Sequence, residues 1–184
     1  VVMRMIIEGH FDEAPAERIA EVAFAAYQAV SRGAPADVVE GIALYGYRKQ
    51  ISGDRISRWA NGYRQMTNGK VPPDVAADLI RNAMEKDWDD KTFDTLKWAL
   101  VQAVQDRFAI KNYATYLFGN MTGNRKPGEL TGAARSYFKK ITKSGAAPQL
   151  PAYEGTFTQK PKPQIVYEAP APEPCRTCPK LYGL

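Results

Sequence analysis

Proline is distributed unevenly along this chain of 184 residues, and its distribution limits where helices and strands can form. Eight of the thirteen prolines follow Ala147: Pro148, Pro151, Pro161, Pro163, Pro170, Pro172, Pro174 and Pro179. Because proline lacks a backbone N–H and has a fixed φ, this density excludes helices and central strands. We therefore divide the chain into a helical body, residues 1–145, and an extended Pro-rich C-terminal arm, residues 146–184.

The arm carries more apolar side chains than a disordered linker usually does. They include Tyr153, Phe157, Ile165, Tyr167, Leu181 and Tyr182. An extended segment has no core of its own, so it offsets its ordering entropy only by lying on another surface. We expect these six residues to anchor the arm on a neighbouring subunit. The alternative is a mobile tail without contacts.

Apolar residues of the body recur at helical spacing. The pattern predicts six helices: Pro15 to Arg32, Asp37 through Tyr45, Ser52 or Asp54 to a stop near Asn61-Gly62, Pro73 through Met84, Lys91 to Phe118, and Thr131 to Lys143. Alternation of period two is scarce outside Val1–Ile7, and no internal repeat of fixed length is visible. The expected fold is all-α, a compact bundle of about six helices.

Charge alternates in blocks along the body. Residues 8–40 hold seven acids and two arginines (net −5), whereas residues 47–70 hold six bases and one acid (net +5). Residues 74–94 hold seven acids and three bases (net −4), and residues 111–143 hold seven bases and one acid (net +6). Such blocks favour faces of opposite sign, which suit a polyanion partner or head-to-tail contact between copies of the chain. Solvated helix faces are the simpler interpretation.

The chain lacks the residues that most catalytic and metal sites need. His10 is the only histidine, and Cys175 and Cys178 form a single CxxC pair. A closed zinc site needs four ligands, and a thioredoxin-like site needs the pair at the start of a helix. We expect a local disulfide or idle thiols; cross-links to other chains and a metal site shared between copies are the remaining interpretations. We expect no enzyme, no metal and no cofactor.

A basic, Gly-rich loop covers residues 123–128 and precedes a predicted helix. Glu129 and Leu130 stand where a phosphate-binding P-loop has Lys and Ser or Thr, so the loop departs from that motif. Arg125 and Lys126 are still placed to meet a phosphate or an acidic neighbour at the helix N-terminus. A polar turn between two helices is the alternative.

No run of roughly 18 apolar residues occurs, so we expect no membrane insertion. The opening Val1–Ile7 is too short for a secretory signal and lacks a cleavage site. A cytoplasmic or virion location agrees with both observations.

Residues 51–62, Ile-Ser-Gly-Asp-Arg-Ile-Ser-Arg-Trp-Ala-Asn-Gly, resemble the recognition-helix segment of Cro-like and related phage-repressor helix-turn-helix domains. Residues 71–76 are similar to the start of the helix that follows in that family. The resemblance implies that the major groove is faced by Ser52, Gly53, Asp54, Arg55 and Arg58, and that the core is faced by Ile56 and Trp59. Lys49 and Gln50 depart from the family, which has a Leu near the end of the preceding helix.

Together these features predict a non-enzymatic structural subunit of a larger homo- or hetero-oligomeric assembly. Protein subunits of the same assembly are the expected partners, packed by opposite-charge faces, with the arm draped over a neighbour. A virion neck, connector or capsid-associated protein fits this design of body and arm. The alternative is a helix-turn-helix DNA-binding protein of phage-repressor type, with Ser52, Arg55, Arg58, Arg125 and Lys126 as candidate contacts to nucleic acid.

Overall fold

The computed structural model describes residues 1–11, 14–121 and 126–153. Eight α-helices and no strand lie within these ranges. They are α1 (Val2–Phe11), α2 (Ala16–Ser31), α3 (Ala36–Arg48), α4 (Gly53–Asn68), α5 (Pro73–Glu85), α6 (Asp90–Gln105), α7 (Ile110–Asn120) and α8 (Pro127–Ser144). The expected all-α class is confirmed for the described residues, whereas the expected number of six helices is wrong.

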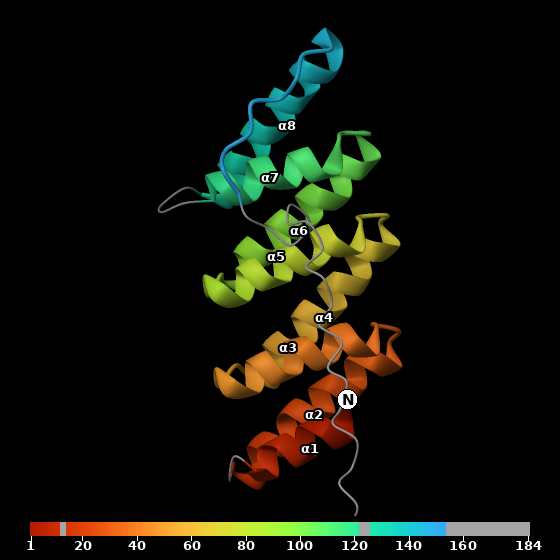
Figure 1. Ribbon diagram of the computed structural model, residues 1–184, viewed down its shortest axis with the longest axis vertical. Coiled ribbons are helices and arrows are strands. Elements are labelled where there is room, and N and C mark those ends of the chain that lie inside the picture. Colours follow the sequence, from red (N-terminus) through yellow and green to blue (C-terminus); the bar gives the residue numbers. More distant parts are fainter. Residues whose placement is uncertain (12–13, 122–125, 154–184) are drawn as a thin grey trace, which may run out of the picture.

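The helices stack along one axis in two rows (Figure 1). The first row contains α1, α3, α5 and α7, and the second contains α2, α4, α6 and α8. Each helix makes its main contacts with the helices one or two positions away in the chain. The architecture is therefore a solenoid-like stack of helix pairs, in which each pair covers its neighbours.

The stack has a fixed repeat length. The second-row helices begin 37 residues apart, at Ala16, Gly53, Asp90 and Pro127. The same spacing separates the starts of α3, α5 and α7, at Ala36, Pro73 and Ile110. Our expectation that no such repeat exists is wrong. Few residues are identical between repeats, because equivalent positions keep their apolar or polar character and not their residue type. The fourth residue of α2, α4, α6 and α8, for example, is Ile19, Ile56, Phe93 and Leu130.

The turns between helices share one backbone shape. After the six turns from α1 to α7, a backbone N–H donates to the carbonyl five residues earlier; the donors are Ala14, Ala34, Ile51, Val71, Trp88 and Phe108. Five of the turns have a residue with φ between 47° and 89° just before that donor: Gly33, Gln50, Lys70, Asp87 and Arg107. This is the Schellman ending of a helix, which usually takes glycine at the positive φ. The helix expected over Lys91–Phe118 is therefore two helices, because Arg107 takes this conformation between α6 and α7.

Close packing between helices explains a second wrong boundary. A Cβ atom on Gly62 would lie 2.6 Å from Cζ of Phe93, so glycine allows α4 and α6 to approach. Asn61-Gly62 thus lies inside α4, which continues to Asn68, and does not end the helix as expected. The same device recurs where α3 meets α4, since a Cβ on Gly46 would lie 2.6 Å from Cδ1 of Ile56.

The core runs through the whole stack. Its largest fully buried side chains include Trp59, Phe93, Tyr113 and Phe118. Ile56 is buried with Trp59, in the inward orientation that the sequence implied.

The first and last helices also differ from expectation. Residues 2–11 form helix α1 instead of continuing the period-two pattern of Val1–Ile7, and α8 begins at Pro127 instead of Thr131. α8 ends at Ser144, where Gly145 has φ 67°, the left-handed conformation that glycine often adopts after a helix.

Candidate functional site

α1 leaves an apolar surface at one end of the stack. Its side chains Met3, Ile6 and Ile7, which we call the open end, are 69%, 44% and 47% exposed. The residues that occupy the position of Ile6 in α3, α5 and α7 are no more than 3% exposed: Ala43, Ile80 and Leu117. The difference arises because, in the structure, α1 has a helix pair on one side only.

A groove between α3 and α5 shows which surface covers the positions of the open end in a later first-row helix. The counterparts of the open end in α5 are Ala77, Ile80 and Arg81. They line a groove of about 300 Å³ opposite Val38, Gly41 and Ile42 of α3. The open end is thus the face with which a first-row helix meets the first-row helix before it.

The two outer charge blocks lie at opposite ends of the stack. The described residues of the 8–40 block lie in or near α1, α2 and α3 and hold five acids and two arginines (net −3). Those of the 111–143 block lie around α7 and α8 and hold six bases and one acid (net +5) (Figure 1). The molecule is therefore electrostatically polar along its long axis.

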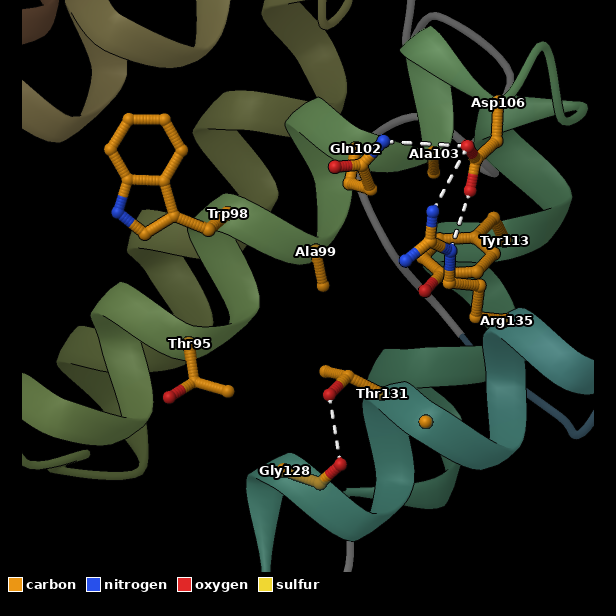
Figure 2. A pocket seen from close by; sticks show the side chains of 11 residues that line it. Thr95, Trp98, Ala99, Gln102, Ala103, Asp106, Tyr113, Gly128, Thr131 and Arg135 are labelled. Atoms are coloured by element: carbon orange, nitrogen blue, oxygen red, sulfur yellow. Dashed lines mark hydrogen bonds and ion pairs between the residues drawn. The ribbon is translucent and has the colours of Figure 1, made fainter.

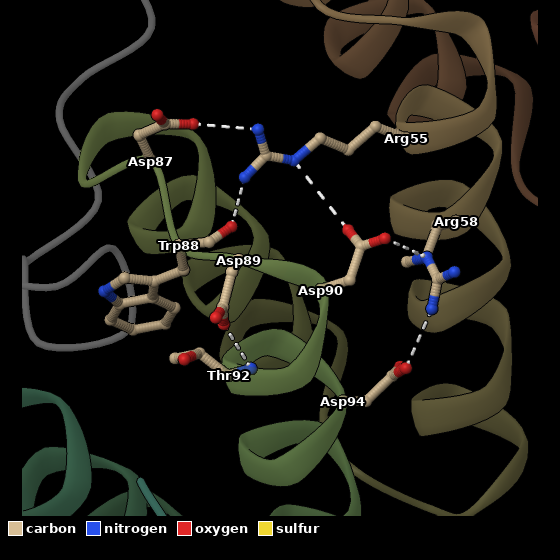
Figure 3. A network of polar contacts seen from close by, with 8 residues as sticks. All are labelled: Arg55, Arg58, Asp87, Trp88, Asp89, Asp90, Thr92 and Asp94. Atoms are coloured by element: carbon tan, nitrogen blue, oxygen red, sulfur yellow. Dashed lines mark hydrogen bonds and ion pairs between the residues drawn. The ribbon is translucent and has the colours of Figure 1, made fainter. Parts of the chain in front are cut away.

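The two inner charge blocks pair with each other (Figure 3). Arg58 lies 3.1 Å from Asp90 (Nε to Oδ2) and 3.0 Å from Asp94 (Nη1 to Oδ2). Arg55 lies 2.9 Å from Asp87 (Nη1 to Oδ1) and also donates a hydrogen bond to the carbonyl of Trp88. Basic α4 is thus held against the acidic start of α6.

The same network contains the residues expected to read DNA. Arg55 and Arg58 do lie on one side of α4, but three carboxylates face them, so a DNA phosphate would have to displace these ion pairs. Arg55 also has a structural counterpart 37 residues earlier, because Arg18 donates to the carbonyl of Ile51 as Arg55 does to that of Trp88. Ser52 is the N-cap residue of α4, and its side chain makes no capping hydrogen bond.

A hollow of about 340 Å³ lies between α6 and α8 (Figure 2). Trp98 on its wall is 56% exposed. Asp106 binds Arg135 (Oδ2 to Nε, 2.7 Å) and Gln102 (Oδ1 to Nε2, 3.3 Å). The Arg135 guanidinium holds the pKa of the Asp106 carboxyl below its ordinary value, and burial raises the pKa of Tyr113 to about 12. The Asp106 carboxyl thus stays charged and the Tyr113 hydroxyl stays neutral near neutral pH.

Lys126, an expected anion contact, is the N-cap residue of α8. Its side chain is exposed, and Nζ lies 3.8 Å from Oε1 of Glu129. Its expected partner, Arg125, lies outside the described residues.

The first eight residues of the arm, 146–153, lie on their own body (Figure 1). The backbone N–H of Gln149 donates to the hydroxyl of Tyr137 on α8 at 2.6 Å. Farther along, Pro151 packs on α7, where a Cβ at Gly119 would lie 2.6 Å from its Cγ. Gly119 was expected to end a helix; it lies within α7 and lets the arm approach.

Tyr153 anchors this part of the arm between α5 and α7. Its hydroxyl lies 3.2 Å from Oδ2 of buried Asp78 and accepts a hydrogen bond from Nδ2 of Asn82 at 2.8 Å. Its ring centroid lies 5.5 Å from that of Phe118. Burial raises the pKa of Tyr153 to about 12, so the hydroxyl keeps its proton and can donate it to Asp78.

Tyr153 was expected to anchor the arm on a neighbouring subunit, and in the structure it contacts its own chain. The other expected anchors and the cysteine pair lie outside the described residues: Phe157, Ile165, Tyr167, Leu181, Tyr182, Cys175 and Cys178.

Two features of these surfaces were missed from the sequence. One is the open end, which would have been found by aligning the chain on itself with an offset of 37, since Val1-Val2 then falls on Val38-Val39. The other is buried Asp78, which has Gly41 as its counterpart one repeat earlier. No local sequence signal marks its burial.

Among the described residues, no three His, Cys, Asp or Glu side chains gather in a way that could hold a metal ion. None of the helices in that part of the chain is long and apolar enough to cross a membrane. Comparison with known proteins finds no matching family model, no matching curated protein and no matching solved structure.

Proposed function

We propose that the protein is a non-enzymatic structural subunit that assembles head to tail with copies of itself. The proposal is carried by the open end, where Ile6 is 44% exposed although its counterparts in α3, α5 and α7 are buried. Apolar surface removed from water contributes roughly 25 cal/mol per Å², so this face favours a covering partner.

The charges of the two ends select the orientation. The acidic block, residues 8–40, directly follows the open end in the chain, and the opposite end of the stack is basic. Two open ends that met each other would bring like charges together, whereas head-to-tail contact brings opposite charges together. Such heterologous contacts build rings or filaments rather than closed dimers.

The repeat indicates which second-row surfaces would meet. α6 faces α8 with Thr95, Trp98, Ala99 and Gln102. The counterparts of these residues on α8 are exposed or charged: Gly132, Arg135, Ser136 and Lys139. The α8 residues that face α6 are Gly128, Thr131, Gly132 and Arg135. Three repeats earlier, α2 has Glu17, Ala20, Glu21 and Phe24 at the same positions. If α2 of one copy packed on α8 of another, the glutamates of α2 would face Lys139, whereas Arg135 already pairs with Asp106 of its own chain.

Light scattering after size-exclusion chromatography of the full chain, over a range of protein and salt concentrations, tests this function. We expect association that weakens with salt and is lost in Ile6→Asp. Gln65→Glu, a charge change at an exposed position of α4, is the matched control and should associate like the wild type. A wild type that stays monomeric at every concentration, or an Ile6→Asp variant that associates normally, would overturn the proposal.

A charge-swap pair tests the orientation separately. Glu17→Lys and Lys139→Glu should each weaken association, and a mixture of the two variants should restore it, because each then offers the complementary end. Equal association of both single variants and the wild type would exclude this end-to-end contact.

A further inference from the structure

The stack contains two versions of one groove between first-row helices. Tyr153 occupies the groove between α5 and α7, where it contacts Asp78, Asn82 and Phe118. The residues 37 positions earlier are Gly41, Tyr45 and Arg81, of which Gly41 and Arg81 line the groove of about 300 Å³ between α3 and α5. The second groove is therefore the Tyr153 site, one repeat closer to α1.

The lining of the α3–α5 groove suits an aromatic ring without a hydroxyl group. Its walls are mainly apolar and include Val38, Ile42, Ala77, Ile80 and Met84. A cavity of about 150 Å³ already holds benzene, so this groove has room for a phenyl ring.

The polar groups that hold the Tyr153 hydroxyl have no equivalent there. Gly41 replaces Asp78, and nothing lies within 4 Å of the place where its Cβ would be. Tyr45 replaces Asn82, and its own hydroxyl already donates to the carbonyl of Met84 at 2.9 Å. Arg81, in place of Phe118, lines the groove, and its guanidinium pairs with Asp78 (Nη2 to Oδ1, 3.1 Å).

The arm approaches this groove in the right direction. It passes from α8 at Gln149 to α7 at Pro151 and reaches the α5–α7 groove at Tyr153, moving one helix at a time toward α1. The next aromatic residue is Phe157. Four extended residues span about 13 Å, and packed helices lie about 8–10 Å apart. Phe157 can therefore reach the neighbouring groove.

We propose that Phe157 of the arm occupies the α3–α5 groove of its own chain, as Tyr153 occupies the α5–α7 groove. The arm is then a strap that joins α3, α5 and α7 across the first row. This inference goes beyond the end-to-end function, because it concerns a different face and needs no second copy.

Cross-linking in the full chain tests the proposal. Gly41→Cys and Phe157→Cys are introduced together with Cys175→Ser, Cys178→Ser and Ile6→Asp, which removes the proposed association. We expect rapid disulfide formation within one chain at low protein concentration. The matched control replaces Phe157→Cys with Tyr182→Cys and should react at least tenfold more slowly. Equal rates in the two variants, or no cross-link, would refute the proposal, and a cross-link only between chains would place Phe157 in a neighbour's groove and refute it too.

Methyl NMR gives a readout without added cysteines. A seated phenyl ring shifts the methyl resonances of Ile80 and Met84, and Phe157→Ala should move both signals. Phe157→Leu, an apolar control, should keep the arm in place yet lose the ring-current shifts. Methyl signals that stay unchanged in Phe157→Ala would show that the ring lies elsewhere. Because these experiments read the groove alone, they distinguish failure of the strap from failure of the end-to-end function.

Discussion

The two ends of the stack present surfaces of opposite character. At the open end, Ile6 occupies a position that is buried in every later first-row helix, and the acidic block, residues 8–40, follows it in the chain. At the other end, α8 has Ser136 and Lys139 at exposed positions, so this face is polar and basic. The difference teaches that a residue's role in such a stack depends on which neighbour covers it. An isoleucine is core in α5 and surface in α1 without any change in local structure.

The largest test of this comparison puts the same charge at two equivalent positions. Leu117→Asp buries a carboxylate in α7 and should lower the free energy of unfolding by more than about 4 kcal/mol, enough to unfold the chain. Ile6→Asp should change it by less than about 0.5 kcal/mol, since water already reaches this side chain. Urea unfolding followed by circular dichroism measures both. Similar losses in the two variants would contradict the unequal burial of this position.

Two glycines sharpen the comparison between a filled and an open position on α3. Gly46→Ala forces a methyl group against Ile56 and should cost about 1–3 kcal/mol of unfolding free energy. Gly41→Ala, made together with Phe157→Ala so that the proposed ring is removed from the groove, adds a methyl group in open space and should stabilise the protein by up to about 1 kcal/mol, because alanine favours a helix over glycine. Thermal and urea unfolding should therefore shift in opposite directions. A destabilised Gly41→Ala would mean that something already fills the groove.

The arm-bearing end has a pH-dependent contact. The pKa of Tyr153 is raised to about 12, so the folded state favours the neutral hydroxyl. Its contribution is complete below pH 10 and is lost as the pH rises from about 10 to 12. Tyr153→Phe should cost about 1 kcal/mol at neutral pH and should weaken this alkaline loss. Tyr113 titrates in both proteins, so the difference between their unfolding free energies against pH isolates Tyr153.

The smallest expected effect concerns Asp106, beside the hollow of Figure 2. Arg135 lowers the pKa of this carboxyl, so its contribution is present above its ordinary pKa of about 3.9 and is lost as the pH falls through the folded value. Arg135→Gln should flatten the acid side of the stability profile slightly and leave the alkaline side unchanged. Urea unfolding between pH 2 and 6 measures the change. An acid limb identical to that of the wild type would show that the pair contributes nothing.

Helix starts were easier to predict than helix ends. Proline marks the beginning of α2 and α5 through Pro15 and Pro73, and the sequence located both helices. The end of α6 carries no such mark, because Arg107 adopts a conformation usually left to glycine. Conversely, Gly62 was expected to end a helix, but it lies inside α4, where the absence of a Cβ lets the Phe93 ring of α6 pack closely. Both errors arise because backbone conformation and packing with distant residues are settled by the whole stack.

The candidate surfaces were predictable in kind and less so in place. Alternating charge predicted faces of opposite sign, and the structure separates the outer blocks along its axis. An aromatic anchor was expected at Tyr153, but composition does not identify the surface that receives it. The open end was missed because Val1–Ile7 alternates like a strand, and only its alignment with α3 reveals the repeat position.

Contact between near neighbours alone has a mechanical consequence. Among the described residues, no substantial contact joins α1 or α2 to α6, α7 or α8, so nothing in that part of the chain fixes the distance between the two ends directly. Bending can be distributed over the interfaces between successive helix pairs, each of which changes its angle by a small amount. A force applied at one end is transmitted to the other end through every helix pair between them. A chain of such units would behave as a compliant rod whose stiffness is set by its weakest joint.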